Sequence, residues 1–164
     1  MRRGVDGWRM NGRPPVLEPG ELRVDRAVLH GMLAHARQDA PRECVGLLFG
    51  QGGRIRRRVP LPNAAPEPER HYYAEPVALL RAFRAAEARG EEHLGIYHSH
   101  PHGPDTLSRT DLAEAHYAVP AFLVLPLPGR VRAFCIAGNA CTEVSFRVEE
   151  QAEPTSSKAD GVVD

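Results

Sequence analysis

The apolar residues of this chain fall into two alternating kinds of segment, and this alternation limits the folds it can adopt. Short apolar runs bounded by Gly, Pro or Asn have the length expected of strands. They lie at 44–50, 93–98, 121–126, 130–138 and 141–148. Between them, residues 26–39 and 76–89 repeat apolar side chains at helical spacing. Helices interleaved with strands predict an α/β fold, a sandwich in which a mixed β-sheet is packed by helices.

The ends of the predicted helices carry specific start and stop residues. Asp25 is placed to cap the amino terminus of the first helix, and Pro76 is placed to begin the second, which stops at Gly90. Ser108 is placed to cap a third helix, with Asp111 three residues later in the pattern of a capping box. The segment between the strand at 93–98 and Ser108 contains two Pro and one Gly, so we expect a loop there.

Four arginines lie on the second strand of a predicted hairpin that turns at Gly52-Gly53. They are Arg54, Arg56, Arg57 and Arg58, and they alternate only partly with apolar residues. We expect this strand to present a solvated arginine face. A nucleic-acid patch and a docking surface for an acidic partner are the alternatives.

The 164 residues predict one domain with two loose ends. Residues 1–20 are rich in Gly, Pro and Arg and predict a flexible arm, and residues 150–164 predict a disordered tail. The domain then spans 21–149. Its apolar runs are too short to cross a membrane, and the amino terminus has no apolar signal region. The formal net charge of zero argues against general binding to nucleic acid or to a membrane surface.

The three cysteines, Cys44, Cys135 and Cys141, have no paired spacing. Their odd number argues against a disulfide framework and favours a reducing, cytoplasmic location. Cys44 lies in an apolar strand, so we expect it to be a buried core residue. A thiol nucleophile beside a histidine is the alternative reading of this position.

The segment 98–111, HSHPHGPDTLSRTD, contains a candidate metal site. His98 and His100 are two residues apart at the end of a strand, so both side chains point to the same face. Asp111 lies in the first turn of the next helix, which the intervening loop can fold back beside them. Two imidazoles and one carboxylate with a fourth position open are the ligands of a catalytic zinc site. Two histidines hydrogen-bonded to backbone are the alternative.

Two further residues fit the chemistry of such a site. Glu43 precedes an apolar strand, and its charge in that position suggests a general acid/base beside a cation. Ser108 could donate a hydrogen bond to a developing oxyanion. The simpler alternatives are a solvated charge at a strand end for Glu43 and a plain helix cap for Ser108.

The full pattern, Glu43 followed by His98-x-His100-x(7)-Ser108-x-x-Asp111, resembles the JAMM, or MPN-plus, metalloproteases. The resemblance also includes 41–50, Asn63, GIYHSHP at 95–101 and the late strands. It implies a cytidine-deaminase-like α/β sandwich. It further implies that Zn²⁺ is held by His98, His100 and Asp111, that Glu43 is the acid/base, and that Ser108 is at the oxyanion.

The same resemblance implies hydrolysis of the amide or isopeptide bond after the carboxy-terminal Gly-Gly of a ubiquitin-like protein. Bacterial relatives act on sulfur-carrier proteins of this fold, so we expect such a protein or its conjugates as partner. We expect the enzyme to be a monomer or a homodimer. A non-catalytic MPN-type scaffold is the alternative, and the H-x-E and P-C-x-x-C motifs of nucleoside deaminases are absent from the sequence.

Overall fold

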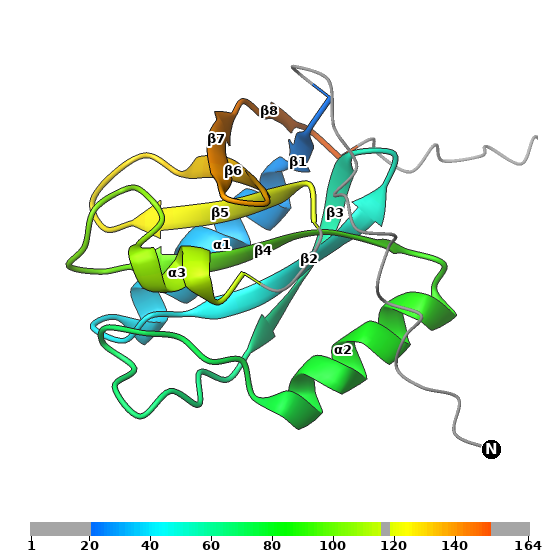
Figure 1. The fold of residues 1–164 in the computed structure, drawn as a ribbon. Helices are drawn as coiled ribbons and strands as arrows, with labels where there is room; N and C mark the ends of the chain where they lie inside the picture. Colours follow the sequence, from blue (N-terminus) through cyan, green and yellow to red (C-terminus); the bar gives the residue numbers. More distant parts are fainter. Residues whose placement is uncertain (1–20, 116–118, 152–164) are drawn as a thin grey trace, which may run out of the picture.

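The structure is a computed structural model that describes residues 21–115 and 119–151. Figure 1 shows three helices around one curved sheet. The helices are α1 (Arg26–Asp39), α2 (Pro76–Ala88) and α3 (Arg109–Ala113). The strands are β1 (Arg23–Asp25), β2 (Val45–Gln51), β3 (Arg54–Leu61), β4 (Glu92–His100), β5 (Ala121–Pro126), β6 (Arg132–Ala137), β7 (Ala140–Val144) and β8 (Arg147–Glu149).

The eight strands form one mixed sheet in the order β7-β6-β5-β4-β2-β3-β1-β8. β4 and β5 are parallel, and so are the pairs that β1 makes with β3 and β8, whereas the remaining neighbours are antiparallel. The predicted α/β fold, with a mixed sheet packed by helices, is therefore confirmed.

The helices cover opposite faces of the sheet, because successive strand residues point to opposite sides. Leu48 of β2 and Tyr97 of β4 face α1, with which they share a buried cluster. Leu47 and Ile96, one residue earlier on each strand, face α2 in a second buried cluster. The two cores explain why β2 and β5 are buried on both faces and appear in the sequence as continuous apolar runs.

The prediction of one strand over 141–148 is wrong. β7 and β8 are separated only by Ser145 and Phe146, yet they lie at the two ends of the strand order. Three peptide units span at most about 11 Å, so the sheet must curl until its edges approach each other, as the upper part of Figure 1 shows. β8 pairs with β1. Because β1 has only three residues, it is too short to show a strand periodicity in the sequence.

The structure also corrects the prediction of a solvated arginine face. Among the four arginines of β3, only Arg56 is exposed, and the other three are half-buried. Arg54 pairs with Asp25 at 2.7 Å and Glu149 at 3.2 Å, and Arg57 pairs with Glu91 while it lies over the Phe49 ring. The pairing acids come from other parts of the chain, so the local pattern could not reveal them.

Two further features of the chain ends bear on the predictions. Residues 1–20 and 152–164, predicted as an arm and a tail, lie outside the described residues. Glu150, within the predicted tail, is described: its backbone carbonyl accepts a hydrogen bond from Arg54 at 3.1 Å, and its side chain pairs with Arg26. Among the described residues, none of the helices is long and apolar enough to cross a membrane.

Asp25 precedes α1 as predicted but does not cap it with its side chain. Its side chain is 3% exposed, and the carboxylate accepts a hydrogen bond from Nε of Arg54 instead. The Asp25 side chain therefore connects β1 to β3. The sequence pattern predicted its position before the helix correctly, but the predicted capping hydrogen bond is not formed.

We expect Asp25→Ser to destabilise the protein as much as Asp25→Ala, by about 2–3 kcal/mol, because both leave the part-buried Arg54 guanidinium without this partner. Urea denaturation of the two variants measures the loss. If capping were the role of Asp25, the serine variant would retain most of the stability, and that result would contradict the assignment.

Candidate metal centre

Two histidines at the end of β4 form one side of the candidate site. His98 and His100 are on the same face of the strand, and their side chains are 0% and 5% exposed. β4 is held between β2 and β5 along this stretch, with Val45 opposite His98 on one side and Val124 on the other. The strand runs two residues beyond its predicted end, so both imidazoles are carried on rigid backbone.

The third residue, Asp111, is aimed at the histidines by the start of α3. Ser108 Oγ accepts a hydrogen bond from the Asp111 backbone N–H at 3.0 Å, and Asp111 Oδ2 accepts one from the Ser108 backbone N–H at 2.7 Å. These two bonds form the predicted capping box. Because α3 is only five residues long, the main effect of this capping box is to fix the position of the Asp111 carboxylate.

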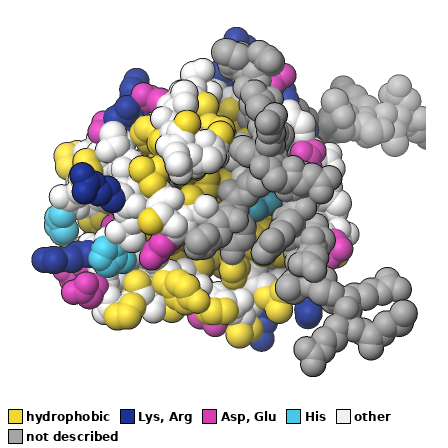
Figure 2. Space-filling view, in the orientation of Figure 1, with side chains coloured by type: hydrophobic (Ala, Val, Ile, Leu, Met, Phe, Trp, Pro, Cys, Tyr) yellow, Lys and Arg dark blue, Asp and Glu magenta, His cyan; other side chains and the backbone are white. Residues whose placement is uncertain are grey.

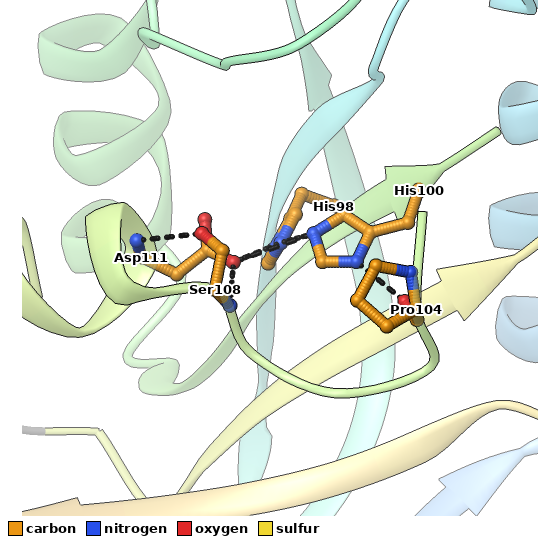
Figure 3. Close-up of polar contacts among 5 residues, drawn as sticks. All are labelled: His98, His100, Pro104, Ser108 and Asp111. Carbon is orange, nitrogen blue, oxygen red and sulfur yellow. Dashed lines mark hydrogen bonds and ion pairs between the residues drawn. The ribbon is translucent and has the colours of Figure 1, made fainter. Parts of the chain in front are cut away.

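The three side chains converge on one point, as Figure 3 shows. Nε2 of His98 lies 2.9 Å from Nε2 of His100, and each of these nitrogens lies 3.3 Å from Oδ2 of Asp111. Tetrahedral ligands of zinc, bound at about 2.0–2.1 Å, are about 3.3 Å apart. The triangle of donor atoms therefore has the size that one such ion requires. It is the only group of three or more potential ligands found within the described residues.

Hydrogen bonding fixes which nitrogen of the His100 imidazole faces the centre. Nδ1 of His100 lies 2.7 Å from the Pro104 carbonyl oxygen, to which it donates, so Nε2 is free to bind a metal. Nδ1 of His98 is buried with no partner among the described residues. The Tyr72 ring lies against the same imidazole, with ring centroids 4.5 Å apart.

Burial and the shared carboxylate shift the pKa values of these groups in different directions. Burial lowers the pKa of His98, which favours its neutral, metal-binding form. Burial opposes ionisation of Asp111, but hydrogen bonds from His100 and His98 outweigh it and hold the pKa of this carboxyl well below its usual range. Burial likewise opposes protonation of His100, yet the Asp111 carboxylate raises its pKa overall.

Glu43 lies beside this cluster at the start of β2, with a side chain only 6% exposed. Burial raises its pKa to about 7; nearby His100 opposes the shift, and the Asp111 carboxylate adds to it. Its backbone is held on both sides, because its N–H donates to the Pro68 carbonyl at 2.7 Å and its carbonyl accepts from Asn63 Nδ2 at 2.9 Å.

A crevice of about 220 Å³ opens beside the cluster. Its walls include Glu43, His100 and Ser108, together with Glu69, Arg70 and the loop 101–104. Figure 2 shows histidine, arginine and acidic side chains gathered on the left side of the molecule, where Figure 1 places the loops around α3. Tyr72 also lines a separate apolar pocket of about 340 Å³ with Leu79 and Phe122.

The structure brings together all five residues that the sequence predicted for the site. Sequence reasoning missed Tyr72, Pro104, Glu69 and Arg70, and it noted Asn63 without a role. Nothing local marks these residues, because the loop that carries most of them has no periodicity and reaches the site only through tertiary contacts.

Cys44 is a buried core residue, as predicted. It belongs to the cluster on the α1 side of the sheet, and burial raises the pKa of its thiol to about 11. A thiol with that pKa is almost entirely protonated near neutral pH, which argues against a nucleophilic role.

The sequence profile of the prokaryotic homologues of the JAB domain matches residues 25–149. The chain therefore belongs to this family, and the resemblance to JAMM proteins drawn from the motif is confirmed. It is 44% identical over 115 residues to the probable TtuB-protein conjugate cleaving protease of Thermus thermophilus, covering 70% of this chain and 76% of that protein.

Two other similar proteins support the assignment. The CysO-cysteine peptidase of Mycobacterium tuberculosis is 34% identical over 137 residues, with 79% of this chain and 91% of that protein covered. The solution structure of a protein from Desulfitobacterium hafniense matches with a TM-score of 0.72 and 29% identity, covering 80% of this chain and 95% of the other.

We expect Glu43→Gln to raise the melting temperature of the metal-free protein at pH 8 by about 2–4 °C and to change it little at pH 5. The pKa of Glu43 is raised on folding to about 7, so the cost of its buried charge is present above pH 7 and disappears as the carboxyl protonates at lower pH. Calorimetric melting at both pH values measures this, with the exposed Glu69→Gln as control. Equal shifts at the two pH values would contradict the explanation.

Proposed function

We propose that this chain is a zinc-dependent peptidase that hydrolyses the amide or isopeptide bond after the carboxy-terminal Gly-Gly of a ubiquitin-like, sulfur-carrier type protein. The observation that carries the proposal is the convergence of His98, His100 and Asp111 on one point beside the buried Glu43 carboxylate. This donor set leaves a coordination position for water or substrate, as catalytic zinc sites do.

In this proposal the three converging side chains hold the zinc ion through Nε2 of each histidine and Oδ2 of Asp111. Zinc bound there supplies Lewis-acid polarisation of the scissile carbonyl and activation of a water molecule. The carbonyl of Pro104 keeps His100 in the required tautomer, and the capping box keeps Asp111 in place.

The proton transfers fall to Glu43. As general base it takes a proton from the attacking water, and as general acid it gives that proton to the leaving amine when the C–N bond breaks. A pKa near 7 in the metal-free site suits both roles, although a neighbouring cation will lower it. The Ser108 hydroxyl uses its oxygen to accept from Asp111 N–H, so its own hydrogen is available to donate to the oxyanion.

The substrate class in this proposal rests on the relatives. One is named a probable TtuB-protein conjugate cleaving protease and another a CysO-cysteine peptidase. The resemblance drawn from the motif implies a ubiquitin-like carrier as substrate. A cytoplasmic location, a monomeric or homodimeric state and the absence of nucleic-acid or membrane partners stay predictions from the sequence.

Zinc-loaded protein should cleave a ubiquitin-like carrier extended beyond Gly-Gly, and chelation should abolish the cleavage. Glu43→Gln should keep one zinc per chain and lose at least about 100-fold in kcat, the usual scale for a general acid/base. Mass spectrometry follows the product, and metal analysis follows zinc. Cleavage that survives both chelation and Glu43→Gln would refute the proposal.

Ser108→Ala removes the proposed oxyanion donor and should lower kcat by about 100-fold or more, the scale of such a donor. It also removes half of the capping box, so zinc content and melting temperature must be measured alongside. Ser108→Thr keeps the hydroxyl and serves as the matched control. A loss of kcat in Ser108→Ala that only follows loss of zinc would assign Ser108 a structural role.

A further inference from the structure

Arg70 is an exposed residue on the wall of the crevice that Glu43, His100 and Ser108 also line. Within the described residues, no ion pair joins its guanidinium to an acid. Several other arginines in the described part of the chain are paired, including Arg54, Arg57 and Arg132. The unpaired guanidinium of a residue that lines a crevice is available to bind an anion there.

The backbone around Arg70 is tied to the backbone of Glu43. Asn63 Nδ2 donates to the carbonyl oxygens of both Glu43 and His71, each at 2.9 Å. The Glu43 N–H donates to the Pro68 carbonyl at 2.7 Å, and the Arg70 N–H donates to the Glu67 carbonyl at 3.0 Å. These hydrogen bonds hold the backbone of segment 67–71 in place relative to Glu43. They therefore also fix the Cα position from which the Arg70 side chain extends.

Arg70 and Glu43 line the same crevice, and this indicates which part of a substrate Arg70 would meet. Glu43 gives its proton to the leaving nitrogen, so the wall beside it faces the leaving group. When the leaving group is a single amino acid, its α-carboxylate is attached to the carbon that carries the scissile nitrogen. When the leaving group is a lysine side chain, that nitrogen is attached to a neutral methylene chain, and no carboxylate is nearby.

We propose that Arg70 binds the free α-carboxylate of a single amino acid attached to the carboxy terminus of a ubiquitin-like protein. The enzyme would then trim such an extension in preference to cleaving a lysine conjugate. This inference rests on the proposed function and specifies its substrate. The planar guanidinium can bind both carboxylate oxygens, which an ammonium group cannot do with the same geometry.

The test compares two forms of one ubiquitin-like carrier that ends in Gly-Gly-Ala, one with a free carboxylate and one with a carboxamide. For the zinc-loaded protein we expect kcat/KM about tenfold higher with the carboxylate, the scale of one charge-assisted hydrogen-bonded pair. In Arg70→Gln the ratio of the two values should fall to about one, and in Arg70→Lys it should be intermediate.

Glu69→Gln is the matched control, because Glu69 lines the same crevice with the opposite charge, and it should keep the preference for the carboxylate. Equal kcat/KM for the two forms in the unmodified protein, or the same preference in Arg70→Gln, would overturn the inference. A third substrate, with Gly-Gly joined to the ε-amine of a blocked lysine, should be cleaved no faster than the carboxamide. Faster cleavage of this substrate would also overturn it.

Calorimetric binding to the Glu43→Gln variant provides a second readout that needs no turnover. The carboxylate form should bind more tightly than the carboxamide, and adding Arg70→Gln should remove the difference. If no substrate is cleaved by the zinc-loaded protein, the proposed function fails, and the binding comparison still decides whether Arg70 recognises the carboxylate.

Discussion

The site depends on the buried carboxylate of Asp111, which lies between two buried imidazoles. A charge removed from water must find partners, and Asp111 finds them in Ser108 N–H, His98 and His100. Ser108 caps the helix that carries Asp111, whereas the two histidines come from the end of β4. The end of β4, the loop 101–107 and the cap of α3 must therefore all form correctly before the charge is compensated. This coupling makes the candidate metal centre part of the fold.

The antiparallel pairing of β2 with β4 brings the acid/base residue to the same place. Val45 lies opposite His98 in the ladder, so the residues just before β2 emerge beside the end of β4. Ser99 reinforces this register, because its N–H donates to the Cys44 carbonyl at 3.1 Å and its Oγ accepts from the Cys44 N–H at 2.8 Å. Two segments more than fifty residues apart thus meet by ordinary sheet hydrogen bonding, and the apolar runs that build the sheet also position the chemistry.

The sequence was sufficient to predict what depends on local pattern. The mixed α/β architecture, the helix beginning at Pro76, the strand 121–126 and the capping box at Ser108 follow from periodicity and end signals. The split of the last strand into β7 and β8 does not, because it depends on the curl of the whole sheet. The ion pairs of Arg54 and Arg57 and the approach of Tyr72 to His98 are likewise tertiary. The five residues predicted for the site could be selected from the sequence because the spacing of their motif is characteristic, whereas the residues around them carry no such signature.

The residues that line the crevice come from two kinds of structure. One group lies at the end of β4 and the start of α3, and the other lies in an irregular loop. The wall formed by His100, Ser108 and the loop between them is tied to the candidate ligands, so a change there would also disturb the candidate metal centre. The part of the wall that includes Glu69 and Arg70 belongs to an irregular loop attached to Glu43 through Asn63 and Pro68. Exposed side chains on that loop can change while its backbone anchors remain. Under the two proposals above, selectivity and chemistry lie on separately anchored segments, so a change in the exposed residues of this loop would alter the leaving group accepted without altering the hydrolytic residues.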